Sequence, residues 1–294
     1  MAQQIPINES TETGIEIPEE GVFEIAPDLA YRRLALVNIM LFGQPHQPEW
    51  VLIDAGLPGT AGIIARTAEA RFATDGPPAA ILLTHGHFDH VGALTTLAER
   101  WGVPIYAHPL EHPYLDGTTA YPKPDAHVGG GIMSMLAPLY PRGPLSVSLW
   151  LRAYPQDGTV PHMPGWRWIH TPGHSVGHVS FWRESDRCLI AGDAFITTAQ
   201  ESAYAVTVQE PELHGPPMYF THDWQAARDS VQRLAKLAPE VVVTGHGRAM
   251  HGEAMRTALN RLATDFDRVA VPKDGRYVNQ PQTAADGSAY PGRN

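Results

Sequence analysis

The sequence predicts a protein of the α/β class, built as one large domain of layered sheets and helices. Short apolar runs recur along the chain, and segments with a helical period lie between several of them. Such runs are typical of strands buried inside an α/β domain. The 294 residues suffice for one domain with a sizeable core. We expect this domain to cover residues 21–270, after a loose lead-in over residues 1–20 and before a C-terminal tail over residues 271–294.

The first half of the chain is predicted to contain four strands and two helices. The predicted strands cover Val22 to Ile25, Leu34 to Phe42, Trp50 to Ile53 and Ala80 to Leu83. The predicted helices cover Ala61 to Arg71 and Val91 to Trp101. The third and fourth strands end abruptly in polar residues, and α/β proteins present functional side chains at such turns.

Residues 109–165 differ in composition from the segments around them. Prolines, glycines and aromatic residues are frequent there, and only Gly131 to Leu139 has the pattern of a helix. Free linkers rarely contain so many aromatic residues. We therefore predict an insertion that packs over the domain.

Strand patterns resume after the insertion, and two helices follow. The predicted strands cover Trp166 to Ile169, Val179 to Trp182, Leu189 to Ala191 and Val241 to Val243. Thr221 is the predicted N-cap of the next helix, because apolar residues follow it at a helical period. The last helix is predicted from about Glu253 to Val269, and the polar segment from Pro281 onward is expected to be loose.

The charge of the chain disfavours two classes of partner. With 21 basic and 31 acidic residues, the formal net charge is −10. An acidic surface repels nucleic-acid phosphates and anionic lipid headgroups. The first residues lack the basic start and apolar stretch of a secretory signal, and no apolar run is long enough to span a bilayer. We expect a cytoplasmic protein that acts on a small-molecule substrate, without nucleic acid or membrane as partner; a homodimer stays open.

The single cysteine, Cys188, excludes an intramolecular disulfide and a cysteine-based zinc cluster. It lies within an apolar run that is predicted to be a buried strand. A small core residue is therefore expected at this position, not a reactive thiol.

The densest group of potential metal ligands follows the predicted strand Ala80 to Leu83. Within six residues the chain places His85, His87, Asp89 and His90. Imidazole and carboxylate suit zinc, and a turn at the carboxyl end of a strand can direct these side chains to one point. Four ligands from one turn are too many for a single open site, so this motif predicts two metal ions.

Three more candidates repeat this placement, each at or just past a predicted strand: His174, Asp193 and His246. A glycine beside each of them lets the backbone turn sharply and approach a crowded centre. Five histidines and two carboxylates at strand ends are expected to bind two divalent ions, with one carboxylate between them.

In order and type, these seven residues resemble the metal ligands of the metallo-β-lactamase superfamily, over roughly residues 20–270. The resemblance implies a four-layer αββα sandwich, and two Zn²⁺ as cofactors, with Fe, Mn or Co as other candidates for the native metal. It also implies two ligand sets and one bridge: His85, His87 and His174 for the first ion, Asp89, His90 and His246 for the second, and Asp193 between them.

Other residues are expected to act around the metal ions. Asp54 corresponds to the aspartate that ends an early strand in the family, and it is expected to hydrogen-bond a ligand imidazole and fix its tautomer. His178 matches a second histidine of the family pattern, for which a supporting role is expected. Phe88, Tyr114 and Phe195 are hypothetical substrate-lining residues. The insertion is expected to contribute no metal ligand.

The resemblance implies hydrolysis by a hydroxide that bridges the two ions and attacks a carbonyl. Asp89 is expected to ligate and also to orient the nucleophile or pass a proton. The sequence has no Gly-x-Ser-x-Gly motif of a serine hydrolase. Asp193 disfavours β-lactam hydrolysis, since typical β-lactamases of the superfamily lack an aspartate bridge.

Within the superfamily, hydrolases of esters and lactones fit the sequence best, because the aromatic insertion indicates an apolar pocket. Hydrolysis of a glutathione-type thioester or of a phosphotriester stays open. A further alternative is a persulfide dioxygenase with one iron, in which Asp89, His90 and His246 would have no role. A binding or regulatory protein that keeps its metals without turnover is the last.

Overall fold

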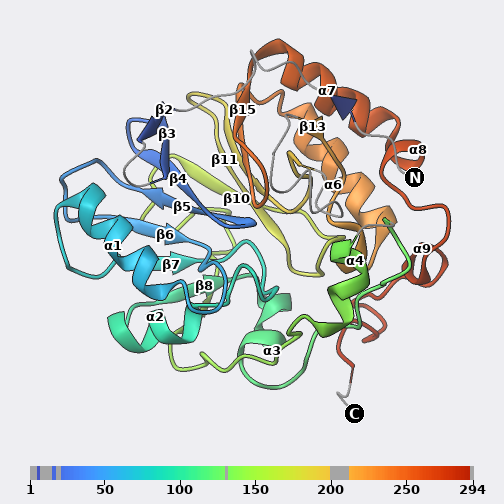
Figure 1. The fold of residues 1–294 in the computed structure, drawn as a ribbon, viewed down its shortest axis with the longest axis horizontal. Coiled ribbons are helices and arrows are strands. Elements are labelled where there is room, and N and C mark those ends of the chain that lie inside the picture. The colour runs from blue at the N-terminus through green and yellow to red at the C-terminus, as the bar shows by residue number, and fades with distance from the viewer. Residues whose placement is uncertain (1–4, 7–14, 18–20, 130–131, 199–211, 292–294) are drawn as a thin grey trace.

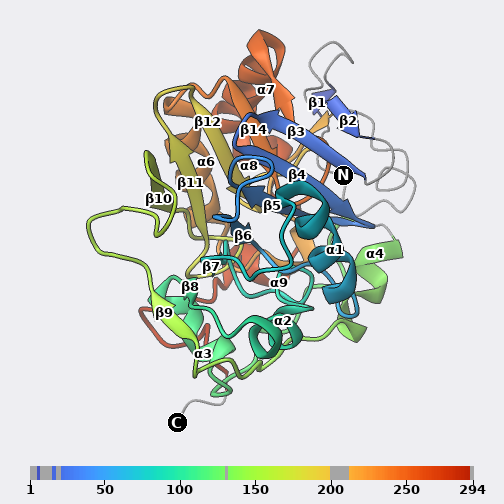
Figure 2. The same ribbon diagram turned by 90° about the vertical axis from the view of Figure 1, so that its left-hand side faces the viewer.

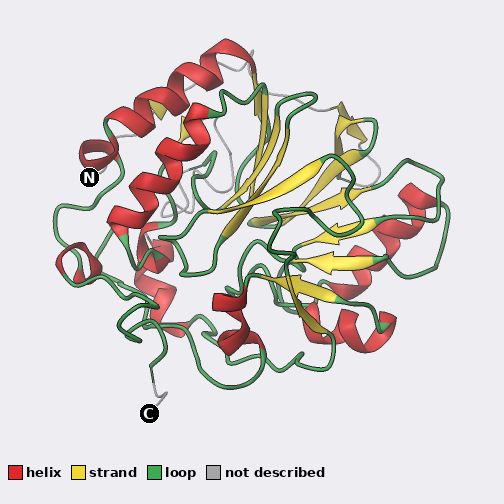
Figure 3. Cartoon of the chain, turned by 180° about the vertical axis from the view of Figure 1, so that it is seen from behind, coloured by secondary structure: helices red, strands yellow, loops and turns green. Residues whose placement is uncertain are grey.

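In the computed structural model, two β-sheets lie face to face, and helices cover the outer face of each (Figures 1 and 3). The structure describes residues 5–6, 15–17, 21–129, 132–198 and 212–291. One sheet has eight strands in the order β2-β3-β4-β5-β6-β7-β8-β9, and the other has five in the order β10-β11-β12-β14-β15. A two-stranded sheet pairs β1 with β13. The predicted four-layer αββα sandwich is confirmed.

The strands of the larger sheet are short and lie in chain order. They are β2 (Ile15–Ile17), β3 (Val22–Ala26), β4 (Leu29–Leu34), β5 (Val37–Phe42), β6 (Val51–Ile53), β7 (Ala80–Leu82), β8 (Ile105–Ala107) and β9 (Leu151–Ala153). The other strands are β10 (Trp166–His170), β11 (Val179–Arg183), β12 (Cys188–Gly192), β14 (Val241–Thr244), β15 (Met250–His251), β1 (Ile5–Pro6) and β13 (Glu212–Leu213).

The longer helices cover the outer faces of the two sheets (Figure 1). Those against the larger sheet are α1 (Ala61–Phe72) and α2 (Leu94–Trp101), and those against the smaller sheet are α6 (Trp224–Lys236) and α7 (Gly252–Thr264). The shorter helices are η2 (Pro109–Glu111), α3 (His112–Leu115), α4 (Ile132–Leu136), η3 (Ala137–Leu139), η4 (Met218–Phe220), α8 (Phe266–Val269) and α9 (Arg276–Asn279).

Side chains of the central strands point alternately to the two faces of each sheet, and they pack in three apolar clusters: one under each pair of long helices and one between the sheets. Leu41 of β5 packs in the cluster that contains α1 and α2, whereas its neighbour Met40 packs between the sheets. Leu189 of β12 packs in the cluster that contains α6 and α7, whereas Ile190 packs between the sheets. Successive side chains of a strand point to opposite faces. Strands covered on both faces are therefore apolar at nearly every position, which explains the continuous apolar runs in the sequence.

The single strand predicted over residues 34–42 is wrong, because the chain reverses within it. Ala35 has a φ of 58°, and Leu34 of β4 pairs with Val37 of β5 across a tight antiparallel turn. The strand before the turn is only partly apolar, with Arg32 and Arg33 half-buried. Because β4 contains these two arginines, a search for apolar runs does not detect it as a separate strand. This turn also brings the Leu36 carbonyl to the metal centre.

Helix α6 does not begin where Thr221 predicted. Asp223 is its N-cap, and the Asp223 carboxylate accepts a hydrogen bond of 2.9 Å from the Ala226 N–H. The Thr221 hydroxyl is engaged elsewhere, since it donates to the Pro217 carbonyl at 2.8 Å. Aspartate and threonine are both good N-caps, so the local sequence offered two candidates and the fold used the second.

Two other helix predictions differ at their ends. The helix expected from Val91 begins at Leu94, after a turn in which the His90 and Val91 N–H groups both bond to the His87 carbonyl. The helix expected from Glu253 to Val269 is two helices, α7 and α8, which meet at Asp265.

The insertion contributes to the sheet as well as covering it. Its strand β9 pairs in parallel with β8 as the last strand of the larger sheet. The helix expected over residues 131–139 is α4 followed by η3, and Gly131 lies outside the described residues. Most of the predicted lead-in over residues 1–20 also lies outside them, apart from β1 and β2.

The expectation of a loose segment from Pro281 onward is wrong for the described residues 281–291. Ala289 and Tyr290 are buried in a cluster with Tyr114 and Tyr121 of the insertion. The Tyr114 hydroxyl donates to the Ala289 carbonyl at 2.7 Å, and the Tyr290 hydroxyl donates to the Leu110 carbonyl at 3.0 Å. Figure 2 shows α3 at the lower end of the molecule, where the red C-terminal segment runs beside it. Aromatic packing orders a segment whose own composition favours disorder.

Among the helices that the structure describes, none combines the length and apolarity needed to cross a lipid bilayer.

Candidate metal centre

All seven predicted ligands lie in turns that follow strands of the two sheets. The turn after β7 carries His85, His87, Asp89 and His90. The other three ligands follow strands of the smaller sheet: His174 comes after β10, Asp193 after β12 and His246 after β14. These turns converge, because ligand atoms from them lie within 4.8 Å of one another, and every one of the seven side chains is buried.

The seven residues form three overlapping groups. In each group one ligand atom per residue lies within 4.8 Å of the others: His85, His87 and His174; His85, His90 and Asp193; Asp89, His90 and His246. We call the first the histidine group and the third the mixed group. These match the two predicted ligand sets, and Asp193 joins them.

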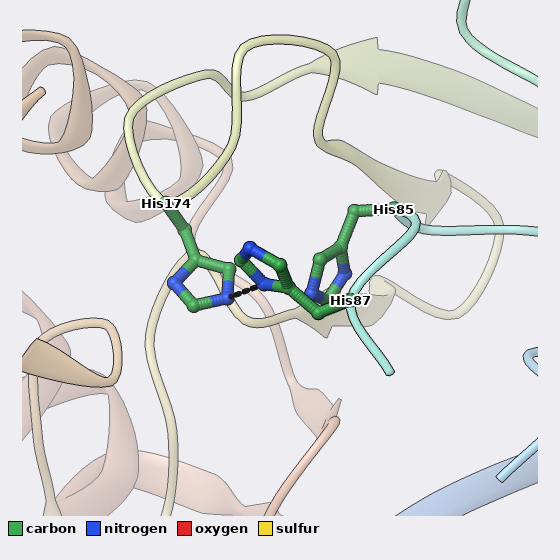
Figure 4. A group of neighbouring side chains, drawn as sticks. All are labelled: His85, His87 and His174. Carbon is green, nitrogen blue, oxygen red and sulfur yellow. Dashed lines mark hydrogen bonds between the residues drawn. The ribbon is translucent and has the colours of Figure 1, made fainter. Parts of the chain in front are cut away.

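Hydroxyl groups set the ring orientation of two members of the histidine group. The Thr84 hydroxyl donates to Asp54, so its oxygen accepts from the Nδ1–H of His85 at 3.0 Å. The Thr221 hydroxyl donates to a carbonyl, so it accepts from the Nδ1–H of His174 at 3.3 Å. In both rings Nε2 then carries the lone pair, and that of His174 accepts a hydrogen bond from Nδ1 of His87. Nδ1 of His87 lies 2.8 Å from Nε2 of His174, and the three rings point toward one another (Figure 4).

Acceptors from the larger sheet orient the mixed group. Nδ1 of His90 donates to the Asp54 carboxylate at 2.8 Å, and Nδ1 of His246 donates to the Leu36 carbonyl at 2.6 Å. Nε2 of His246 then lies 3.4 Å from the Asp89 carboxylate. Asp54 also accepts from the Thr84 N–H and hydroxyl, each at 2.8 Å. Asp54 therefore has the geometry that was expected of a residue that fixes a ligand tautomer.

The Asp193 carboxylate lies between the two groups. Its Oδ2 is 3.1 Å from Nε2 of His246 and 3.4 Å from Nε2 of His174, and its Oδ1 is 3.5 Å from Nε2 of His90. Gly245 makes this approach possible, since a Cβ at that position would lie 2.0 Å from Asp193 Oδ1. The glycine beside His246 is thus required for close approach, as predicted.

Protonation differs between the groups. Burial, with the neighbouring histidines, lowers the pKa of His85 and His87 well below the usual value, and burial does the same for His174. Burial would also lower the pKa of His90 and His246, but nearby carboxylates, Asp193 foremost, outweigh it and raise both. Burial would raise the pKa of Asp193, but His246 and His90 lower it well below its usual range.

The buried polar atoms of the centre fit a bound cation. Nε2 of His85, His87 and His90 and Oδ1 of Asp193 are buried and make no hydrogen bond. A buried polar atom without a partner costs about 1–3 kcal/mol, and four at one place favour a shared ligand. Neutral imidazoles and an ionised carboxylate are the forms that bind zinc and similar divalent ions.

His178 is engaged on both sides of its ring. Its Nε2 accepts from the Asp193 N–H at 2.9 Å, so its Nδ1 carries the proton and donates to the Thr171 hydroxyl at 2.8 Å. Neither nitrogen is left for a metal ion. His178 thus positions the backbone of the central aspartate, in line with the supporting role expected for it.

The three hypothetical substrate-lining residues fall in different places. Phe88 and Tyr114 line a cavity of about 320 Å³ beside the ligand turn. Phe195 does not, because it is fully buried in the core beneath α6 and α7. A larger cavity, of about 550 Å³, lies among Asp28, Trp50 and His162, and none of the seven ligands lines either cavity.

Sequence reasoning missed three buried residues around the centre: Glu111, Tyr121 and His222. Glu111 bonds to both turns of the histidine group, and the Tyr121 ring lies 4.4 Å from that of His87. Nε2 of His222 makes no hydrogen bond, and burial lowers the pKa of this residue to about 3. None of the three belongs to a motif or repeats a period, so no sequence signal marked them.

Comparison with known proteins gives one consistent family. The model of the metallo-beta-lactamase superfamily matches residues 32–246. The chain is 44% identical over 248 residues to the probable metallo-hydrolase YflN of Bacillus subtilis (strain 168), a match that covers 84% of this chain and 94% of YflN. It is 32% identical over 196 residues to the probable metallo-hydrolase YybB of the same organism, covering 67% of this chain and 74% of YybB.

Solved structures show the same fold. A beta-lactamase domain protein from Burkholderia ambifaria superposes with a TM-score of 0.58 at 22% identity, covering 88% of this chain and 81% of that one. The Rm3 metallo-beta-lactamase superposes with a TM-score of 0.57 at 20% identity, covering 85% and 93%. At these identities the likeness concerns the fold alone.

Proposed function

The chain belongs to the metallo-β-lactamase superfamily, and from that premise we propose that it is a dinuclear metallo-hydrolase of carboxylic esters or lactones. The position of Asp193 carries the proposal, since its carboxylate faces His174 of the histidine group and His246 of the mixed group. A central carboxylate flanked by two ligand sets suits a two-metal site. The similarity to proteins described as probable metallo-hydrolases supports hydrolysis.

The residues would divide between two ions. The histidine group would bind one and the mixed group the other, with Asp193 shared and zinc the metal that this donor set favours. Two bound ions activate water at neutral pH and polarise a carbonyl. Asp89 would ligate the second ion and also orient the nucleophile or pass a proton, since its carboxylate lies 3.4 Å from Nε2 of His246 within the mixed group.

The cavity beside the ligand turn supports an apolar substrate. Phe88, Tyr114 and Leu145 line it with several prolines and glycines, and Arg142 is its charged member. Phe88 stacks on Tyr140 with ring centroids 5.1 Å apart, which extends the aromatic surface. Such a lining suits the acyl or aryl part of a neutral ester or lactone, while the net charge of −10 disfavours polyanions.

Two measurements test the proposal. Elemental analysis of purified protein should find two equivalents of zinc or a similar divalent metal per chain, and one iron with little else would favour the dioxygenase alternative. Rates on γ- and δ-lactones, aryl esters, a glutathione thioester, a cephalosporin and a phosphotriester should rank esters or lactones first. A thioester or cephalosporin ahead by tenfold or more in kcat/KM, about 1.4 kcal/mol in transition-state binding, would refute the ester or lactone assignment.

A further inference from the structure

Glu111 is a fully buried carboxylate that lies inside the insertion and contacts both turns of the histidine group. Its Oε2 accepts from the N–H of Gly86, the residue between His85 and His87, at 3.0 Å. Its Oε1 accepts from the Ser175 hydroxyl at 2.8 Å and from the Gly177 N–H at 2.7 Å, just after His174. One side chain therefore joins two ligand turns that lie far apart in the sequence.

Tyr121, also from the insertion, completes this contact. Its hydroxyl donates to Oε2 of Glu111 and accepts from the Gly86 N–H at 2.9 Å. Its ring lies 4.4 Å from the ring of His87 and stacks on Tyr114 with centroids 3.7 Å apart. The insertion thus reaches the histidine group through a polar contact to the backbone and an aromatic contact to a ligand.

Glu111 and Tyr121 pack closely against the backbone of both turns. A Cβ at Gly177 would lie 2.7 Å from the Glu111 Cγ and 2.9 Å from its backbone nitrogen. A Cβ at Gly86 would lie 2.8 Å from the Tyr121 hydroxyl. Because both turns pack directly on Glu111 and its partner, a change in this side chain alters the spacing of the histidine ligands.

The negative charge of Glu111 has a second effect, on the affinity of the histidine group for a cation. The histidine group has no acidic member, so a divalent cation there gains negative charge only from residues outside the group. Burial raises the pKa of Glu111, and hydrogen bonds from Tyr121, Ser175 and two backbone N–H groups oppose that rise. A nearby cation would further favour the carboxylate.

We propose that Glu111 is a positioning residue that sets the geometry and the metal affinity of the histidine group. Its hydrogen bonds reach the turns of His85, His87 and His174, whereas the mixed group is oriented by Asp54 and the Leu36 carbonyl. Glu111 therefore acts on one ion far more than on the other. The inference rests on the metal-binding part of the proposed function and not on the substrate.

The test is the stepwise zinc affinity of Glu111→Gln, measured by competition with a chelator on metal-free protein. The amide keeps the shape but loses the charge, and its NH₂ group must face N–H or hydroxyl donors. We expect one binding constant to fall by about 10- to 100-fold, the range for residues that orient ligands, and the other to stay near the wild-type value. Unchanged binding of both ions, or an equal loss of both, would overturn the proposal.

Double variants identify the affected ion. His87→Ala disables the histidine group, so adding Glu111→Gln to it should cause no further loss of affinity. His246→Ala disables the mixed group, so Glu111→Gln should keep its full effect in that background. The opposite pattern would show that Glu111 acts on the ion of the mixed group, and it would refute the inference.

Two controls keep the result interpretable. Glu212→Gln alters another buried glutamate, which pairs with His214, and it should leave both affinities unchanged. If Glu111→Gln does not fold, Tyr121→Phe and Ser175→Ala each remove one donor and keep the charge, and each should weaken the same ion by a smaller factor. If the wild-type protein binds two ions but cleaves no ester or lactone, the substrate proposal is refuted. The zinc affinities of the variants then still decide whether Glu111 positions the histidine group.

Discussion

The histidine group and the mixed group share Asp193, but different parts of the chain orient them. The mixed group is oriented by Asp54 and the Leu36 carbonyl, both at strand ends or turns of the larger sheet. The histidine group is oriented by hydroxyls and, through Glu111, by the insertion. The sandwich itself thus supports both sets of ligands, and the insertion adds a further support to the histidine group.

The two groups also differ in charge. Burial keeps the histidine group neutral, while the carboxylates around the mixed group raise the pKa of His90 and His246. Protons are therefore expected to compete with a bound cation more strongly at the mixed group than at the histidine group. Chemically similar ligands acquire different states because their neighbours differ.

Removing the shared carboxylate should have the largest effect. Asp193→Ala takes the central anion from both groups, so we expect fewer than two bound ions and a fall in kcat/KM of about 100-fold or more. Metal analysis and steady-state rates measure both. The matched control is Asp157→Ala, an exposed aspartate whose loss should change neither. Two retained ions with full activity would show that Asp193 does not link the groups.

Asp54→Asn should show the reverse selectivity to Glu111→Gln. The amide cannot accept all three hydrogen bonds from Thr84 and His90. We expect the ion of the mixed group to bind about 10- to 100-fold more weakly and the other ion to lose less. Chelator competition on metal-free protein gives both constants. If Asp54→Asn and Glu111→Gln weakened the same ion, the two groups would not have separate supports.

Acid should destabilise the stacking of His108 on His170, the last residue of β10, which leads into the turn that carries His174. His108 stacks on His170 with ring centroids 4.2 Å apart, and burial, followed by the charges of His170 and His112, lowers the pKa of His108 to about 4. Unfolded histidine titrates near 6.5, so the neutral ring stabilises the fold above about pH 6.5. That stabilisation is lost as the pH falls toward 4, because protons then bind the unfolded chain more readily.

His108→Gln removes this titration. The free energy of unfolding of the metal-free variant should therefore fall less than that of the wild type between pH 6.5 and 4, as urea titrations would show. Parallel curves for the two proteins would mean that His108 contributes nothing to the acid sensitivity of the fold.

The smallest effect is expected at Cys188, close to Asp193 in sequence but outside both groups. Burial raises the pKa of its thiol to about 12, so thiolate is scarce at neutral pH and alkylation of the folded protein should be slow. Cys188→Ser should keep both ions and most activity, at a stability cost of about 1–3 kcal/mol from burying a hydroxyl. Rapid alkylation that abolishes activity would contradict this.

The positions of most central strands and the identity of the seven candidate ligands could be predicted from the sequence, because both follow from local patterns. A run such as Leu189 to Ala191 predicts a buried strand, and Asp193 just beyond it lies where strand ends meet. Failures arose where two local solutions compete. Thr221 and Asp223 are both acceptable N-caps, and the hairpin around Ala35 interrupts what looked like one strand.

Composition, period and spacing along the chain were enough to predict the fold class, the family and the chemical types of the candidate ligands. Which nitrogen of each imidazole faces the centre, and which segments support each group, follows from the tertiary structure instead. Those outcomes depend on hydrogen bonds such as His246 to Leu36, His174 to Thr221 and Gly86 to Glu111. Such bonds join residues that are distant in the chain, and only the packed sandwich brings them within reach.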